Sequence, residues 1–302
     1  MRKQFAKTVY DILAHDESAT ILIGDISHYL LSSVEQQFHD RFYNVGICEQ
    51  SLVGVAAGMS MAGMKPIVHT IAPFCVERSF EQIKIDLCYQ KTDVAIVSVG
   101  SSFDYASLGC THHCYEDVAI LRSLPDMNVF VPGNSVEFDR LFKKSWNLKG
   151  PKYFKLSTKE HKLKFDCDPF EVKVLKESSN GLTIFVNGHL LQEVIDAQID
   201  CNIVYCPTLS LISDESINII EHIIKRSRTV LTVEENSVVG GLGDFIFDII
   251  NDREIAMPRN FKKIGIPKKF LTNYGTAEQH RVSLGLTSES IISEATRIHD
   301  RD

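Results

Sequence analysis

Short apolar runs alternate with longer amphipathic stretches along the whole chain. Five apolar runs in the first half predict β-strands, and they lie at 20–24, 66–70, 93–99, 128–131 and 152–156. Helical patterns separate these runs near 49–63, 75–90, 114–124 and 135–147. Strands that alternate with helices in this way indicate right-handed crossovers and a mostly parallel sheet.

A polar stretch rich in lysine, aspartate and serine follows, from Ser157 to Asn180. The alternation then resumes, with strand patterns at 182–186, 202–206, 229–234 and 262–266 and helical patterns at 190–199, 214–227, 242–251 and 287–299. We therefore predict an α/β protein with two doubly wound domains. The first domain spans 1–165, a linker spans 166–180, and a smaller α/β domain spans 181–302.

The composition is that of a globular protein. Of the 302 residues, 44% are apolar and 24% are charged, which leaves room for two domains with cores of their own. The formal net charge of −7 and the lack of a long basic run disfavour binding to nucleic acid or to an anionic membrane. The N-terminal segment has no apolar core, so we expect no signal peptide, and no apolar stretch is long enough to span a bilayer.

The eight cysteines form no Cys-x-x-Cys pair, and most of them lie in apolar surroundings. This usage is typical of buried thiols in a reducing cytoplasm, where we expect the protein to reside. The run Cys110-Thr-His-His-Cys114 has the residue types of a metal site, but a zinc site usually has paired ligands at both ends of its motif. We expect no metal ligand in this chain.

The helical pattern at 49–63 differs from the others because it is apolar nearly all round, so the helix should be buried on every side. Gly54, Ala57 and Gly58 leave little bulk on one face, which lets another helix approach closely. Gly63 is suited to cap the C-terminus. Two interpretations are open, an ordinary core helix and a helix at the interface with a second subunit, and the second is favoured because a carboxylate opens the helix.

Glu49 is the carboxylate that opens this helix, and two interpretations fit it. An acid in the first turn is stabilised by the helix dipole, and position alone favours that structural role. The apolar helix that follows, however, indicates a partly buried carboxyl group. Burial disfavours the ionised form of a carboxyl group, which suits it to share a proton with a ligand.

The residues around Glu49 resemble those of the pyrimidine-binding domain of transketolase-like enzymes. The matching segments in the first half are Val45-Gly-Ile-Cys-Glu-Gln50, Val53-Gly-Val-Ala-Ala-Gly58, Pro66, Phe74, Phe80-Glu-Gln-Ile83, Gly109-Cys-Thr-His-His113 and Val131-Pro-Gly133. The second half is similar to the C-terminal domain of transketolases and deoxyxylulose-phosphate synthases in Thr232-Val-Glu-Glu-Asn236, Gly240-Gly-Leu-Gly243, Gly265-Ile-Pro267 and Tyr274-Gly-Thr-Ala-Glu278. This ordered set covers nearly the whole chain.

The resemblance implies that the chain binds the aminopyrimidine ring of thiamine diphosphate. Glu49 matches the glutamate that hydrogen-bonds ring nitrogen N1′ and activates the cofactor, which then attacks a ketose or 2-oxo-acid carbonyl and serves as the electron sink. Phe74 matches the aromatic residue that stacks on the ring, although a phenylalanine alone is more often a core residue. Ile71 is expected to line the same pocket.

Two histidines and one aspartate complete the expected site. His112 matches the family histidine that faces the reacting atoms of the substrate, so the resemblance implies a catalytic and substrate-binding role. Its neighbour His113 lies in a loop suited to proton handling near neutral pH, and we expect it to contact substrate. Without the match, two solvated loop histidines would be the simpler interpretation. Asp25 ends a strand, where α/β sheets place ligand groups, and is a further candidate for cofactor binding.

Full-length transketolases begin with a domain whose Gly-Asp-Gly motif and downstream asparagine hold the diphosphate and Mg²⁺. No Gly-Asp-Gly occurs in this sequence. The resemblance therefore implies the C-terminal subunit of a split transketolase, with a separate N-terminal subunit that binds the diphosphate and the metal. We expect this chain to pair with itself and the complex to be an α2β2 assembly that acts on a sugar.

The sequence departs from transketolases where those enzymes recognise sugar phosphates. Leu108 stands in place of an aspartate that recognises a substrate hydroxyl, and a further family histidine would fall near Gly100. Thr158 stands in place of the arginine that grips the substrate phosphate, with Lys155 and Lys159 nearby. A lysine binds phosphate as a point charge, so Lys155 is a candidate for substrate binding. A modified sugar, a nucleotide-linked sugar or a small keto compound is equally open as the substrate.

Three functions are therefore considered. The first is a transketolase-like subunit that transfers a two-carbon ketol unit between a ketose and an aldose. The second is the β-subunit of a 2-oxo-acid dehydrogenase, or a carboligase like deoxyxylulose-phosphate synthase. The third is a non-catalytic regulatory or scaffolding subunit. The loop at 111–113 and the segment 265–278 favour the first over the dehydrogenase subunit, and Glu49, Phe74 and His112 argue against the third.

Overall fold

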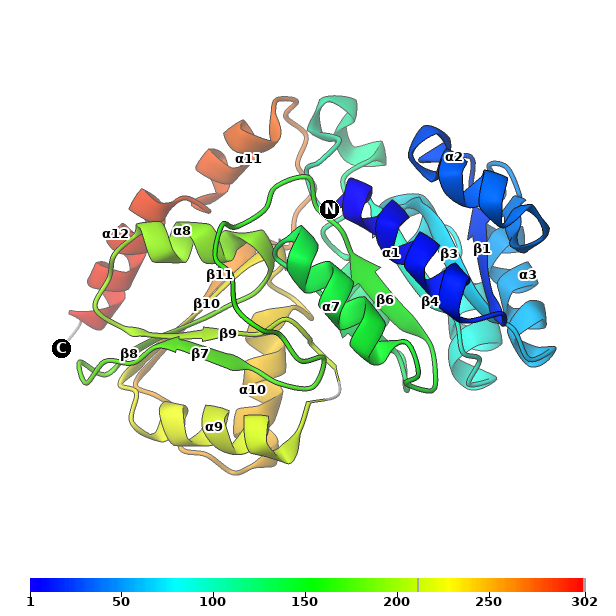
Figure 1. The fold of residues 1–302 in the computed structure, drawn as a ribbon. Coiled ribbons are helices and arrows are strands. Elements are labelled where there is room, and N and C mark those ends of the chain that lie inside the picture. Colours follow the sequence, from blue (N-terminus) through cyan, green and yellow to red (C-terminus); the bar gives the residue numbers. More distant parts are fainter. Residues whose placement is uncertain (211, 301–302) are drawn as a thin grey trace.

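The computed structural model describes residues 1–210 and 212–300, which form two α/β domains lying side by side (Figure 1). The first domain is built on a six-stranded sheet in the order β2-β1-β3-β4-β6-β5, in which all neighbours are parallel. Its strands are β1 (Ala19–Ile23), β2 (Phe42–Asn44), β3 (Lys65–Ile71), β4 (Ala95–Val99), β5 (Asn128–Phe130) and β6 (Lys152–Lys155). The five expected strands are all present. The sequence pattern did not predict β2, because two of its three residues are exposed and it has no apolar run.

Helices cover both faces of this sheet. They are α1 (Arg2–His15), α2 (His28–Gln37), α3 (Glu49–Met61), α4 (Ala72–Val76), α5 (Phe80–Gln82), α6 (Asp117–Arg122) and α7 (Ser135–Ser145), with short 3₁₀ segments η1 (His39–Arg41) and η3 (Ala106–Thr111) and the π-helical η2 (Ile83–Tyr89). Ile21 and Ile23 of β1 belong to the core under α1 and α7, whereas Leu22 belongs to the core under α3. A parallel sheet needs both faces covered, so the predicted doubly wound architecture is confirmed.

Two helices of the first domain are shorter than the sequence pattern predicts. The helix expected at 75–90 is divided into α4, α5 and η2, because Ser79 leaves the helical region with φ −105° and ψ 20°. The helix expected at 114–124 is reduced to α6, because Cys114 forms an antiparallel bridge with Ser102. Both interruptions lie in segments that follow the carboxyl ends of strands β3 and β4.

Helix α3 ends as expected but is not buried on every side within this chain. Gly63 takes a left-handed φ of 94°, and the amides of Gly63 and Met64 bond the carbonyls of Ser60 and Met59, which is a Schellman motif. Leu52, Val53, Ala56 and Ala57 are buried. A stripe one helical turn apart is exposed, formed by Ser51, Val55, Gly58 and Ala62. The single chain therefore leaves one face of this apolar helix uncovered.

The second domain has a five-stranded sheet in the order β11-β10-β8-β9-β7. Its strands are β7 (Lys173–Lys176), β8 (Leu182–Val186), β9 (Asn202–Tyr205), β10 (Thr229–Ser237) and β11 (Asn260–Ile266). Its helices are α8 (Leu191–Asp196), α9 (Asp214–Lys225), α10 (Leu242–Asp252), α11 (Ala277–Leu284) and α12 (Ser288–His299), with the 3₁₀ turn η4 (Gly188–Leu190). Figure 1 shows α8 and α12 on one face of this sheet and α9 and α10 on the other. No helix in the described ranges is long and apolar enough to cross a membrane.

The segment expected to be a linker, 166–180, contains a strand of the second sheet. β7 pairs antiparallel with β9 at the sheet edge, so the second domain's sheet begins before residue 181. The strand has only four residues and a lysine at each end, with two half-buried apolar residues between them. Such short, lysine-flanked strands are typical of sheet edges and resemble loops in sequence.

Backbone hydrogen bonds join the two domains. The amide of Val131 donates to the carbonyl of Pro207 at 2.8 Å, and the amide of Leu209 donates to the carbonyl of Val129 at 3.0 Å. Phe130 and Thr208 form an antiparallel bridge at the same place. The second domain thus covers the edge strand β5 of the first sheet, which would otherwise expose unpaired backbone groups.

His69 of β3 is a fully buried histidine whose two ring nitrogens are both hydrogen-bonded. Nδ1 lies 2.7 Å from the carbonyl oxygen of Val97, which can only accept, so Nδ1 carries the hydrogen. Nε2 lies 2.8 Å from the hydroxyl of Ser27 and accepts from it. The neutral ring therefore satisfies both nitrogens, and a protonated ring would require the Ser27 hydroxyl to turn and accept from Nε2–H in addition to Arg2.

Acid should destabilise the chain through His69. Burial lowers the pKa of His69 from 6.5 to about 4 despite the Val97 bond, and the charge of Arg2 adds to this effect. Between these pH values the unfolded chain binds a proton that the folded chain refuses, so this contribution to stability is present above pH 6.5 and is lost as the pH falls towards 4. The free energy of unfolding should drop by about 2 kcal/mol between pH 7 and pH 5 from this residue, measured by urea denaturation.

The variant His69→Gln isolates this effect. An amide side chain keeps one donor and one acceptor but does not titrate. The variant should therefore lose less stability than the wild type over the same pH interval. Equal losses in the two proteins would show that other groups carry the acid sensitivity.

Candidate active site

Several residues singled out in the sequence follow strands of the first sheet. Asp25 lies just beyond β1, Glu49 lies beyond β2, Ile71 is the last residue of β3, and Gly100 follows β4. Parallel strands share their carboxyl edge, so these residues lie along one edge of the sheet. This is the edge at which open α/β sheets bind ligands.

The Glu49 carboxylate is buried at this edge, with 1% of its surface exposed. The hydroxyl of Thr70 in β3 donates to Oε1 at 3.5 Å, and Arg78 Nη1 donates to Oε2 at 2.5 Å. A Cβ at Gly24 would lie 2.9 Å from Thr70 Oγ1, so glycine lets the end of β1 approach this pair. Glu49 is thus a buried carboxylate neutralised by one arginine, and it is more than a helix-dipole acid.

Phe74 and His112 lie next to this ion pair. The guanidinium carbon of Arg78 is 4.3 Å from the centre of the Phe74 ring. The His112 ring packs edge-on against Phe74, with 5.2 Å between ring centres, and its Nδ1 lies 2.9 Å from Thr111 Oγ1. Both rings are only half-buried. Three predicted site residues, Glu49, Phe74 and His112, therefore come together: Arg78 joins Glu49 to Phe74, and Phe74 contacts His112.

Ile71 lies beside Gly100 and Tyr105 at the same edge. Gly100 has a left-handed φ of 81°, and a Cβ built there would lie 3.3 Å from Ile71 Cγ2 and 2.5 Å from the Tyr105 ring. The Tyr105 ring therefore fills the space that a side chain at position 100 would take. Its centre is 6.2 Å from that of His112, and its hydroxyl accepts a hydrogen bond from Arg2 at 3.4 Å.

His113 points into the domain interface. Its ring is 3% exposed and packs at 5.4 Å from the Phe103 ring and 5.1 Å from the ring of His280 in α11. Burial lowers the pKa of His113, and the two neighbouring histidines add to the effect. The two histidines of the loop thus have different surroundings, and the structure groups only His112 with Glu49 and Phe74.

Asp25 is exposed and hydrogen-bonds Asn44 of β2. The amide of Asp25 donates to Asn44 Oδ1 at 3.1 Å, and Asn44 Nδ2 donates to Asp25 Oδ1 at 3.1 Å. Its φ of 53° is left-handed, which a non-glycine residue adopts at some cost. The carboxylate lies at the ligand-binding edge but on the exposed side of the chain.

Lys155, which was expected to bind substrate, is buried and held by groups of the protein itself. Its ammonium donates to Asp117 Oδ1 at 2.7 Å, to Asn236 Oδ1 at 2.7 Å and to the carbonyl of Cys114 at 3.2 Å. An ammonium has three donors, and these three acceptors use them all. Lys155 therefore joins β6 to α6 and to the second domain.

Comparison with known proteins decides the family. The family model described as "Transketolase, pyrimidine binding domain" matches residues 1–164, more than half of the chain. The chain belongs to this transketolase family. The match covers β1 to β6 and all the residues grouped around Glu49.

Relatives in the transketolase family match the remaining half as well. One subunit of apulose-4-phosphate transketolase is 29% identical in Actinobacillus succinogenes, over 87% of this chain and 86% of its own, and 27% identical in Phocaeicola vulgatus, over 97% and 96%. "1-deoxy-D-xylulose-5-phosphate synthase" of Dictyoglomus turgidum is 31% identical over 87% of this chain and 44% of its own. In extent, the chain is therefore similar to transketolase subunits that are separate polypeptides.

Solved transketolase structures share the fold. A structure described as "Split gene transketolase, inactive beta4 tetramer" matches 99% of this chain and 97% of its own with a TM-score of 0.86 and 26% identity. The transketolase of Campylobacter jejuni matches 97% of this chain with a TM-score of 0.80 at 16% identity, over 46% of its own length. The two-domain arrangement thus corresponds to about half of a full-length transketolase.

The segment 155–159, where the family resemblance places a phosphate-binding arginine, packs against the half-buried Asp104. Thr158 donates to Asp104 through its hydroxyl at 2.7 Å and through its amide at 3.0 Å. Burial raises the pKa of Asp104, and Glu235 adds to this. Lys159 forms ion pairs with Glu193 at 3.0 Å and Glu278 at 3.4 Å. A substrate phosphate at this segment would therefore meet the Asp104 carboxyl group and Lys159, which is already paired.

Sequence reasoning missed Arg78 and Tyr105 among the residues of this transketolase-like site. Arg78 follows Phe74 by four residues, which is one helical turn, and it is the first cation after an apolar run. That spacing is the signal that could have identified it. Tyr105 carries no comparable signal, because a left-handed glycine five residues earlier makes room for it.

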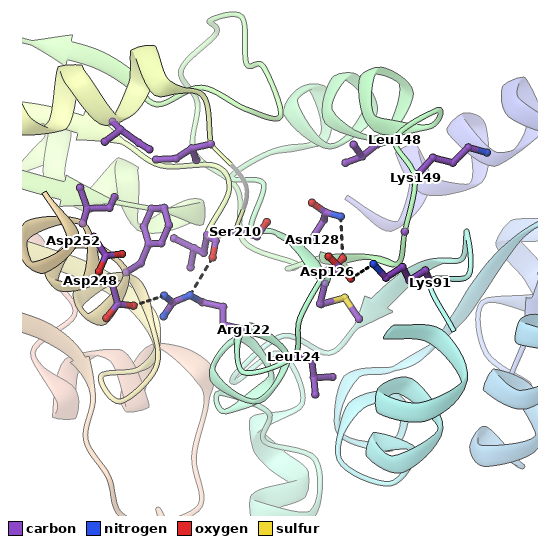
Figure 2. A pocket seen from close by; sticks show the side chains of 17 residues that line it. Lys91, Arg122, Leu124, Asp126, Asn128, Leu148, Lys149, Ser210, Asp248 and Asp252 are labelled. Atoms are coloured by element: carbon purple, nitrogen blue, oxygen red, sulfur yellow. Dashed lines mark hydrogen bonds and ion pairs between the residues drawn. The ribbon is translucent and has the colours of Figure 1, made fainter. Parts of the chain in front are cut away.

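A cavity of about 730 Å³ lies elsewhere, between the two domains (Figure 2). Lys91, Asn128 and Gly150 line it, and they precede or begin β4, β5 and β6. The cavity is therefore at the amino edge of the sheet, opposite to Glu49. Arg122 in its wall is held by Asp248 at 3.1 Å and by three backbone carbonyls. None of Glu49, Phe74, His112 and Arg78 lines this cavity. The cavity is therefore separate from these residues, and we place the candidate active site at the Glu49 edge.

Proposed function

We propose that this chain is the pyrimidine-binding subunit of a thiamine-diphosphate-dependent, transketolase-like transferase. The enzyme would move a two-carbon ketol unit between a ketose and an aldose, including modified or nucleotide-linked sugars. The observation that carries the proposal is the buried Glu49 carboxylate beside the half-exposed ring of Phe74. The relatives at 29% and 27% identity, which are named as subunits of a transketolase for apulose 4-phosphate, support the reaction class.

The residues present fit an aminopyrimidine ring. Glu49 offers a carboxylate oxygen to a ring nitrogen, Phe74 offers an aromatic face, and Ile71 lies one turn away at the strand end. Asp25, on the exposed side of the same edge, remains a candidate contact to the cofactor. When bound, thiamine diphosphate supplies an acidic thiazolium carbon and an electron sink.

The chain's own residues then handle protons and exclude water. Glu49 holds a proton shared with ring nitrogen N1′, and its burial keeps water from competing for that bond. His112 is oriented through Nδ1 by Thr111, which leaves Nε2 to hold or transfer a proton at a substrate oxygen. His113 is buried behind His112. It would influence a substrate only by positioning the loop that carries His112.

We propose that a separate N-terminal subunit holds the diphosphate and Mg²⁺. The sequence has no Gly-Asp-Gly motif, and the described residues contain no group of three His, Cys, Asp or Glu side chains placed to hold a metal. The similar split-gene structure is described as an inactive tetramer of β chains, which supports the need for a partner. The proposed assembly is an α2β2 complex.

The exposed stripe of α3 is the proposed surface for pairing with a second copy of this chain. Val55 is 47% exposed, and Ile85 and Tyr89 of the neighbouring η2 are 43% and 77% exposed. Gly54 and Gly58 let another helix approach closely. The α3 face adjoins Glu49, so pairing there would also close the site.

Six of the eight thiols are free and buried, which suits the proposed cytoplasmic location.

Affinity purification of the tagged chain from its host tests this proposal. We expect a second polypeptide with a Gly-Asp-Gly motif to co-purify, and ketol transfer to require both chains together with thiamine diphosphate and Mg²⁺. The chain alone should show no turnover. Full activity of the purified chain without a second polypeptide would refute the split assembly, and 2-oxo-acid oxidation by the complex would favour the dehydrogenase alternative.

A further inference from the structure

Arg78 fills the space between Glu49 and Phe74 in the free chain. One guanidinium nitrogen donates to Glu49 Oε2 at 2.5 Å, and the guanidinium carbon lies 4.3 Å from the centre of the Phe74 ring. The same group thus makes a hydrogen bond to the carboxylate and a cation–π contact with the aromatic face. These are the two contacts that the proposed function assigns to an aminopyrimidine ring.

A ring that bonds Glu49 Oε2 and stacks on Phe74 where the guanidinium lies would collide with it. A ring stacked on Phe74 would lie with its centre roughly 4.5 Å or more from the Phe74 centre, and a nitrogen bonded to Glu49 would lie about 2.9 Å from the carboxylate. Arg78 already bonds Glu49 Oε2 and lies over Phe74, so it competes with a ring for both partners, while among the described residues Glu49 Oε1 is bonded only by Thr70 at 3.5 Å. We propose that Arg78 is a place-holder that closes the pyrimidine site in the free chain and leaves it when the cofactor binds. This inference rests on the proposed function.

The position of Arg78 in the fold allows it to leave. The residue lies in the turn between α4 and α5, and its side chain is 38% exposed. Glu49 is the only ion-pair partner that holds it within the described residues. Rotation of the side chain therefore brings the guanidinium into water without disturbing a helix. The cation–π contact with Phe74 is lost at the same time.

Departure of Arg78 changes the charge of the site. Two ionisable side chains face Glu49 in the described part of the chain, Arg78 and Cys75. Burial raises the pKa of Cys75 to about 12, and the charge of Glu49 adds to this, so the thiol stays protonated. When the arginine leaves, the Glu49 carboxylate loses its counter-charge, and one proton from solvent must settle between Glu49 and the ring nitrogen. Cofactor binding is thus coupled to the uptake of one proton.

Isothermal titration calorimetry of the complex between this chain and its diphosphate-binding subunit tests the inference. Thiamine diphosphate with Mg²⁺ is titrated in two buffers of different ionisation enthalpy, which gives the Kd and the protons taken up. The variant Arg78→Met removes the place-holder, so its Kd should fall about tenfold, the equivalent of about 1.4 kcal/mol. Proton uptake should differ from that of the wild type, because the guanidinium that leaves Glu49 on cofactor binding is absent from the variant.

Matched variants separate this role from a structural one. Arg78→Lys keeps the cation and should keep the proton uptake, and Arg78→Gln repeats the comparison if Arg78→Met does not fold. Arg259→Met makes the same change at an exposed arginine of the second domain and should leave both values unchanged. A Kd that is equal or higher in Arg78→Met and Arg78→Gln overturns the inference. If the wild-type complex binds no thiamine diphosphate, the proposed function itself fails.

Discussion

Replacing Glu49 by glutamine should lower the turnover of the two-subunit enzyme on the order of 10³-fold. Glutamine has the size of glutamate but cannot share a proton with a ring nitrogen, so the activating step is lost while the packing is kept. The fold should survive, because the Arg78 side chain left without its partner is 38% exposed and can be solvated. The measurements are kcat at saturating thiamine diphosphate and the Tm of the variant.

The control is the same substitution at Glu81, an exposed acid in α5 on the same stretch of chain. Glu81→Gln should keep wild-type turnover and wild-type Tm. Turnover of Glu49→Gln within a few-fold of the wild type would show that Glu49 is a structural acid at the start of α3. In that case the chain would not perform the proposed chemistry.

Replacing Lys155 by methionine should destabilise the chain by about 3–5 kcal/mol. The substitution removes the ammonium that neutralises Asp117, and both side chains are almost completely buried. Asp117 would keep only the hydrogen bond from the hydroxyl of Tyr153, at 2.5 Å. The free energy of unfolding from urea denaturation measures the loss, and the KM of whatever enzyme remains folded should be close to the wild-type value.

Two further variants test the reason for this loss. Lys159→Met removes a half-buried lysine whose partners Glu193 and Glu278 are more exposed than Asp117. This substitution should cost less than about 1 kcal/mol. Lys155→Met combined with Asp117→Asn removes both charges of this pair and should recover at least half of the stability. A Lys155→Met protein of normal stability and raised KM would contradict this structural role and support the prediction that Lys155 binds substrate.

The sequence predicts elements well where one local rule decides them. The alternation of apolar and amphipathic stretches predicts β1, β3, β4, β5 and β6, because each is an apolar run bounded by polar residues. Gly63 predicts the end of α3, because a left-handed residue is needed there and glycine adopts it freely. β7 was missed because four residues with a lysine at each end look like a loop. Its pairing with β9 is decided by a partner that lies elsewhere in the chain.

The sequence by itself determined the two doubly wound domains, the family, and the choice of Glu49 and Phe74 as candidate site residues. These follow from periodicity and from motif order. Only the tertiary structure decided which charges meet: Arg78 pairs with Glu49 across 29 residues, and Lys155 pairs with Asp117 across 38. Burial makes such pairs obligatory, but a buried charge takes its partner from whichever segment packs against it, and local sequence does not specify that segment.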